Sequence, residues 1–279
     1  MTTRRRPVNY ERSILTYIDI LGFSELISNK SAGDISRAIR VVREAAEPRR
    51  FKGAFKEIPS ADFRNFSDLC IIRKVIAKKD KFPASGEVFS QILHMVHVQT
   101  NLLFDEGILL RGGITVGDVA LSYGQLFGPA VVRGYALESQ VARFSRLVVG
   151  EEVLRELRNN PALWVHDPEY DLEATKNLLR RDFDGEYFVD YLRIIEQELD
   201  DRSEYLDQHD EFIKRGLRRY KQSASIRARS ILRIGFHACR RARSRPLLHW
   251  HRAGSGSPCN RRSCKASSRQ AGHWCSTTG

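Results

Sequence analysis

The stretch ILTYIDILGFSELI (14–27) places one carboxylate, Asp19, inside an otherwise apolar run. Such a run predicts a buried β-strand. Moving an isolated carboxylate out of water is costly, so a buried Asp requires a charged partner, a metal ion or a shifted pKa. The residues that follow, Gly22, Phe23 and Ser24, lead into a predicted helix and offer backbone N–H groups to an anion. The stretch therefore predicts a metal and phosphate site at the end of this strand.

Beyond this strand the chain alternates helix and strand patterns. Apolar residues recur at helical spacing after Ser31 and Asp34, either of which can cap the helix. The expected series is a strand at 14–21, a helix at 31–47, a hairpin at 63–76, a helix at 86–104, a strand at 108–121, a helix at 130–143, a short strand at 146–150 and a helix from 151. This order predicts an α/β (α+β) fold with a βαββαβ core, in which a sheet containing antiparallel strands is flanked by helices.

Three further local predictions concern the middle and later parts of this series. Gly112 and Gly113 lie inside a strand pattern, where they indicate a bulge or a close backbone approach. Residues 181–192 are expected to form strands around an Asp-Gly turn. Residues 193–222 are expected to form a charged amphipathic helix.

The positive charge of the chain is confined to its last part. The net charge is +12, yet residues 223–279 contain 11 Arg, one Lys and no acid, so the first 222 residues are electrically balanced. This boundary predicts an N-terminal extension (1–13), one domain over 14–222 and a basic tail over 223–279. The tail has no sustained helix or strand period, which is typical of disorder or of translation in a shifted reading frame. Its Cys and His residues do not have a standard zinc-site spacing.

The composition also bears on location and partners. No run approaches the roughly 20 apolar residues of a membrane helix, and no signal-peptide pattern follows the basic start MTTRRRPVNY. We therefore expect a cytoplasmic protein without a membrane partner. Because the main body is balanced in charge, a nucleic-acid partner would depend on the tail alone.

A second acid completes the predicted metal site. Asp68 lies at the tip of the 63–76 hairpin, which in a βαββ unit lies beside the first strand. Two carboxylates at neighbouring strand ends can hold two divalent cations about 4 Å apart for in-line attack at phosphorus. Hard oxygen ligands favour Mg²⁺ or Mn²⁺. Taken alone, Asp68 fits a turn former as well as a ligand.

Four blocks in order carry a family resemblance: YIDILGFSELI, FRNFSDLCII, LLRGGITVGDV and GQLFGPAVVRGYALESQVARFSRLVV. Together, over about 14–150, they resemble class III nucleotidyl cyclases, and most closely the bacterial Pycsar pyrimidine cyclases of antiphage defence. The resemblance implies a palm-type core and a head-to-tail homodimer with shared active sites. It also implies a cyclic-nucleotide product, two Mn²⁺ or Mg²⁺ ions and a separate effector protein that senses the product.

The resemblance assigns roles position by position. Asp19 and Asp68 match the two metal aspartates, and Ile20 matches the residue whose backbone carbonyl also contacts metal. The turn from Gly22 to Ser24 matches the phosphate-binding turn.

The base-reading positions depart from adenylate cyclases, because Arg64 and Gln125 replace a Lys and an Asp. Gln both donates and accepts, whereas Arg only donates. Uracil presents two carbonyl acceptors around one N–H donor, so this pair favours UTP and a cyclic UMP product. CTP and ATP remain alternative substrates.

The helix after Gly128 departs further, because Val132 and Ala136 replace the ribose-positioning Asn and the transition-state Arg of the family. Arg133, one turn earlier than Ala136, is our candidate for the missing positive charge; pairing with Glu138 or with solvent is its alternative. Glu138 itself fits a helix surface as well as a functional site. These departures leave a second interpretation open, a catalytically degenerate regulatory module.

Overall fold

The computed structural model describes residues 8–47, 61–76, 86–192, 205–207, 209–211 and 214. The basic tail, most of 193–222 and the N-terminal residues before 8 lie outside the described residues. Within the described part, no helix has both the length and the apolar character that crossing a lipid bilayer demands.

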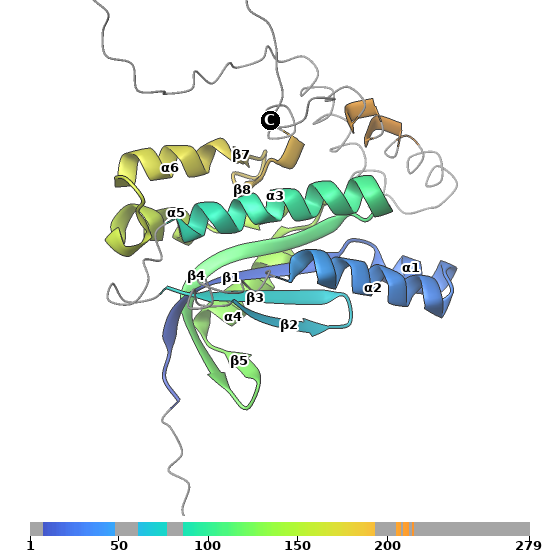
Figure 1. Cartoon of the computed structure of the whole chain (residues 1–279), viewed down its shortest axis with the longest axis horizontal. Coiled ribbons are helices and arrows are strands. Elements are labelled where there is room, and N and C mark those ends of the chain that lie inside the picture. Colours follow the sequence, from blue (N-terminus) through green and yellow to red (C-terminus); the bar gives the residue numbers. More distant parts are fainter. Residues whose placement is uncertain are drawn as a thin grey trace, which may run out of the picture. The chain divides into compact units, whose positions relative to one another are not determined.

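The described residues form a mixed α/β fold around one sheet (Figure 1). Its strands are β1 (Glu11–Ile20), β2 (Asp62–Phe66), β3 (Leu69–Val75), β4 (Leu110–Ser122), β5 (Gln125–Phe127), β6 (Leu147–Val149), β7 (Leu179–Arg181) and β8 (Tyr187–Val189). The spatial order is β2-β3-β1-β4-β6-β8-β7, and β5 pairs with β4. Only β4 and β6 run parallel; the other pairs are antiparallel. The predicted fold class and the βαββαβ order are confirmed.

Helices connect and cover these strands. They are α1 (Phe23–Asn29), α2 (Ala32–Ala46), α3 (Glu87–Glu106), α4 (Pro129–Ala136), α5 (Glu151–Asn159) and α6 (Pro168–Asn177), with a π-helix η2 (Leu137–Val141) and a 3₁₀ turn η3 (Pro161–Leu163). The predicted cap of α2 is confirmed, since the Ser31 hydroxyl accepts from the Asp34 amide and the Asp34 carboxylate accepts in return.

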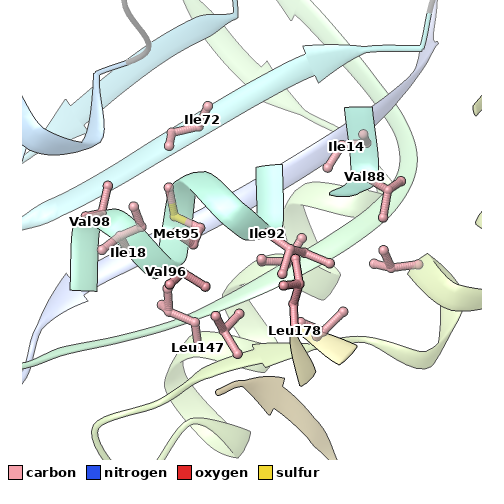
Figure 2. Close-up of a cluster of buried hydrophobic side chains, with 14 of the residues drawn as sticks. Ile14, Ile18, Ile72, Val88, Ile92, Met95, Val96, Val98, Leu147 and Leu178 are labelled. Atoms are coloured by element: carbon pink, nitrogen blue, oxygen red, sulfur yellow. The ribbon is translucent and has the colours of Figure 1, made fainter. Parts of the chain in front are cut away.

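Strand β1 is apolar on both faces because helices cover both. Ile14 and Ile18 belong to the main core, which α2, α3, α5 and α6 complete, whereas Leu15 and Tyr17 pack under α4. Side chains alternate between the faces of a strand, so a strand covered twice reads as a continuous apolar run. Figure 2 shows the main core, where Ile14, Ile18 and Ile72 of the sheet lie beside Val88, Ile92, Met95 and Val96 of α3. By the same alternation Asp19 lies on the α4 face.

Helix α4 lies very close to the sheet because glycine occupies the contact points. A Cβ on Gly134 would come within 2.6 Å of the Tyr17 ring, and one on Gly113 would lie 2.4 Å from the Leu137 Cβ. A Cβ on Gly112 would lie 2.0 Å from the Tyr17 carbonyl oxygen. The close backbone approach predicted for Gly112 and Gly113 is therefore confirmed.

Several predicted boundaries were wrong. The helix expected over 130–143 changes at Ala136 into η2, whose wider turn buries two consecutive residues, Leu137 and Glu138, against the sheet. The strands expected around the Asp-Gly turn of 181–192 are present and pair with each other, but they cover only Leu179–Arg181 (β7) and Tyr187–Val189 (β8). Strand β5 and helix α6 were not predicted; β5 has only three residues, too few to show a period.

Candidate functional site

Asp19 is buried at the end of β1 and has a charged partner there. Its side chain faces that of Arg111 on β4, because the antiparallel register pairs the two residues directly. The Arg111 Nε donates to the Asp19 Oδ2 at 2.7 Å. Only 8% of Asp19 is exposed. The carboxylate inside the apolar run is therefore stabilised by a guanidinium.

The structure brings Asp68 to Asp19. Asp68 follows Ser67 in the tight turn between β2 and β3, where Ser67 has a positive φ of 55°. The pKa of Asp68 is raised to about 7, first by burial and then by a hydrogen bond and charge repulsion with Asp19. Both the burial of Asp68 and the nearby Asp19 carboxylate therefore disfavour the ionised form of this side chain.

Glu138, which the sequence left open between a helix surface and a functional site, joins this cluster from η2. It is 5% exposed, and its Oε1 lies 2.9 Å from the Arg111 Nη2. Burial raises the pKa of Glu138, the positive charge of Arg111 opposes this, and Asp19 adds to the increase. A signal was present: Ala130, Gly134 and Glu138 are spaced by four, which places Glu138 on the stripe that faces the sheet.

Arg111 thus pairs with Asp19 and Glu138, and Asp68 interacts with Asp19. If Asp19, Asp68 and Glu138 are all ionised, two negative charges remain after Arg111 is counted. A divalent cation would balance this excess, and carboxylate oxygens are suitable ligands for Mg²⁺ and Mn²⁺. Among the described residues, no group of three or more His, Cys, Asp and Glu side chains is arranged to hold a metal ion. The predicted cation ligands Asp19 and Asp68 lie together in this cluster, and Arg111 contacts both Asp19 and Glu138.

Ile20 can contribute only through its backbone. Its side chain is 2% exposed and belongs to the main core on the opposite face of the sheet from Asp19. The predicted role of its carbonyl oxygen as a metal ligand is compatible with this orientation and stays a prediction.

The turn after β1 has open space around it. Gly22 has a φ of 82°, which favours glycine, and a Cβ there would meet nothing within 4 Å. Phe23 begins α1 and packs partly on the core, whereas Ser24 is exposed. No side chain caps the start of α1. The turn is therefore accessible, and no side chain takes the place of an anion at the first amides of this helix.

Arg64 and Gln125 also come together. In the sheet register, Ile71 of β3 lies between Arg64 of β2 and Tyr17 of β1, so these side chains share one face of the sheet. Asp19 is two residues after Tyr17 and therefore lies on the same face. Its Nε donates to the carbonyl oxygen of Gly124 at 3.3 Å, directly before Gln125. Gln125 begins β5 and is exposed. The two residues proposed to read the base are thus neighbours in space, although 60 residues separate Arg64 from Gly124.

The structure does not bring Arg133 to Asp19. The Arg133 Nε donates to the Glu152 Oε1 at 3.0 Å, and the Thr115 hydroxyl donates to the same oxygen at 2.7 Å. Burial alone would raise the pKa of Glu152, but these two hydrogen bonds lower it below its usual value. Arg133 is 44% exposed at its side chain, so it remains accessible from outside the chain. Its expected alternative partner, Glu138, is instead bound to Arg111.

No model of a known protein family matches the sequence. No curated protein matches it either.

Among solved structures, the chain is similar to the adenylyl cyclase CyaB from P. aeruginosa, with 14% identity over 66% of this chain and 96% of that chain and a TM-score of 0.47. It is also similar to a class III adenylyl cyclase-like ATP-binding protein from Pseudomonas aeruginosa, with 13% identity and a TM-score of 0.39. That match covers 59% of this chain and 40% of the other. At these values neither likeness establishes an activity for this chain.

Proposed function

We propose that the protein is a nucleotidyl cyclase that converts a nucleoside triphosphate, UTP in preference, to the 3′,5′-cyclic nucleotide and pyrophosphate. The observation that carries the proposal is the convergence of Asp19 and Asp68, from the end of β1 and the β2–β3 turn, at a place with excess negative charge. The sequence resemblance to class III cyclases supports the same reaction.

In this reaction the 3′-oxygen of the ribose forms a bond to the α-phosphorus while the bond to the β-phosphate oxygen breaks. The 3′-proton is lost to solvent, and pyrophosphate leaves. Asp19, Asp68 and the Ile20 carbonyl would hold two Mn²⁺ or Mg²⁺ ions. When bound, these cations supply charge neutralisation for the triphosphate and for the leaving group.

The chain's own groups supply position and selectivity. The open turn Gly22–Phe23–Ser24 offers uncapped amides to the phosphates. Arg64 and Gln125 offer donors and an acceptor to the base edge, and their proximity supports a joint role. Uracil suits this set best; CTP and ATP are the alternatives.

A homodimer would complete the site. Large apolar side chains are exposed on the β2–β3 turn, the β4–β5 hairpin and the outer side of α4: Phe66, Tyr123, Phe127, Val132 and Tyr135. Apolar groups clustered on the site's face are typical of an interface. In a head-to-tail dimer, metal residues of one protomer would meet base-reading residues of the partner. The accessible Arg133 could then supply positive charge across the interface.

The cyclic nucleotide would serve as a second messenger in antiphage defence, read by a separate effector protein. This biological role follows from the resemblance to Pycsar cyclases alone.

The test is a product assay with each of the four radiolabelled nucleoside triphosphates and Mn²⁺. We expect cyclic UMP from the intact protein and none from Asp19→Ala or Asp68→Ala. Asp105→Ala, which removes an exposed Asp from the end of α3, is the matched control and should retain activity.

The second candidate function is a degenerate regulatory module, which Val132 and Ala136 favour because they replace catalytic residues of the family. Nucleotide binding without a cyclic product from any of the four substrates would favour it. Activity that survives truncation at residue 222 would limit the basic tail to an accessory role.

A further inference from the structure

Arg111 bridges two carboxylates that come from different parts of the fold. Its Nε contacts the Asp19 Oδ2 at 2.7 Å and its Nη2 contacts the Glu138 Oε1 at 2.9 Å. The side chains of Asp19 and Glu138 are 12% and 6% exposed, and that of Arg111 is 31% exposed. The contact with Asp19 is a hydrogen bond, whereas the contact with Glu138 is an ion pair whose geometry makes no hydrogen bond to the Glu138 Oε1.

This contact occupies an oxygen that a metal ion would need. Asp19 is one of the two carboxylates that fit a divalent cation, and one of its two oxygens is already bound to a positive charge. A cation arriving beside Asp68 would face repulsion from Arg111 and competition for Asp19. Glu138 offers the guanidinium a second, buried anchor, so Arg111 can release Asp19 without losing all of its ionic partners.

We propose that Arg111 is the resident counter-cation of this site: it weakens the binding of a lone divalent cation, and Glu138 retains the guanidinium when Asp19 takes up metal. The proposal rests on the metal-binding role of Asp19 and Asp68 in the proposed function. The site would then bind a divalent cation tightly when the triphosphate is present, because the negative charge of the triphosphate compensates for the guanidinium. Without the triphosphate it would bind the cation only weakly.

The experiment measures Mn²⁺ affinity of the full chain without nucleotide, by calorimetry and by the electron paramagnetic resonance signal of free Mn²⁺. Arg111→Gln should bind Mn²⁺ at least about tenfold more tightly, because it removes the competing charge. Glu138→Gln should bind it about tenfold more weakly, because Arg111 then has Asp19 as its remaining partner. Arg37→Gln removes an exposed Arg that pairs with Glu106 and should leave the affinity unchanged.

Arg111→Lys distinguishes the effect of the ionic bridge on Mn²⁺ affinity from the effect of the positive charge. Lysine keeps the positive charge but lacks the planar fork, so the bridge is lost and Mn²⁺ should bind more tightly than in the wild type. If Arg111→Lys binds Mn²⁺ as the wild type does, net charge alone sets the affinity and the bridge proposal is wrong. It is also wrong if Arg111→Gln binds Mn²⁺ equally or more weakly while thermal melting shows a folded protein.

Failure of the proposed function gives a different result. If Asp19→Asn and Asp68→Asn bind Mn²⁺ as tightly as the wild type does, the metal site is refuted, and the proposed role of Arg111 is refuted as well. If these two variants abolish binding but Arg111→Gln does not tighten it, the metal site stands and only the counter-cation proposal is refuted.

Discussion

The contact between Gly113 and Leu137 makes a strong prediction, because it sets how deeply the π-helix lies on the sheet. In Gly113→Ala the new Cβ would lie 2.4 Å from the Leu137 Cβ, 3.3 Å from its Cδ1 and 3.5 Å from the Glu138 amide nitrogen. Ordinary contacts between such carbon atoms are about 3.5–4.0 Å. The start of η2 must therefore move by about 1 Å, and the movement includes the residue that holds Arg111.

The expected loss of stability follows from this overlap. Inserting one carbon into a packed contact typically costs about 1–3 kcal/mol, and the upper part of this range applies here because the nearest atom is a Cβ, which no rotamer change can move. For a domain of this size the melting temperature should fall by about 2–4 °C per kcal/mol. Leu137→Ala should not rescue the variant, since alanine keeps the clashing Cβ.

The assay is urea denaturation followed by fluorescence, with Gly33→Ala as the matched control. Gly33 lies in the first turn of α2, and a Cβ there would meet only the Ser31 hydroxyl at 3.7 Å. Because alanine favours helix by up to about 1 kcal/mol over glycine, the control should be neutral or slightly more stable. If Gly113→Ala is as stable as Gly33→Ala, α4 and η2 do not lie on the sheet as described.

Three further perturbations test other parts of the structure. Asp68→Asn should increase the stability of the metal-free protein over the wild type by more at pH 8 than at pH 5. The pKa of Asp68 is about 7 in the folded state and ordinary in the unfolded state, so the wild type loses stability as the pH rises between these two values, whereas the variant does not. Urea denaturation with EDTA at both pH values measures this difference. Ser31→Ala should cost about 1 kcal/mol through loss of the α2 cap, measured in the same way. Arg146→Met should cost about 3–5 kcal/mol in the same urea denaturation, because it leaves the aspartates of the 182–184 turn without their buried partner. Arg155→Met, at an exposed position, should cost little.

Most of the fold was predictable because its signals are local. The continuous apolar run of β1 indicated a strand buried on both faces, and Pro129 at the first turn of α4 indicated where that helix begins. Strand β5 and helix α6 could not be predicted in this way. The three residues of β5 are defined by pairing with β4, and α6 carries few apolar residues at helical spacing.

The candidate site was predictable only in part. Asp19 is conspicuous because it interrupts an apolar run, but the partner that stabilises it, Arg111, is 92 residues away and is selected by strand register. The spacing of four from Ala130 and Gly134 was a local signal for Glu138, but the change from α-helix to π-helix at Leu137 was not predicted. Sequence reasoning therefore found the two aspartates but not the guanidinium that pairs with Asp19.

The presence of Arg111 also bears on the choice between an enzyme and a regulatory module. A module that binds no metal would be more stable with Asn at position 68, because Asp68 must either keep a proton or face the charge of Asp19. The ion pair with Arg111 is sufficient to neutralise the buried carboxylate of Asp19, so Asp68 and Glu138 are not needed for that purpose. Instead, Arg111 pairs with both Asp19 and Glu138, and Asp68 interacts with Asp19, so the acids in this cluster outnumber the base. Such a surplus of acids agrees with the cation uptake that the proposed cyclase activity requires.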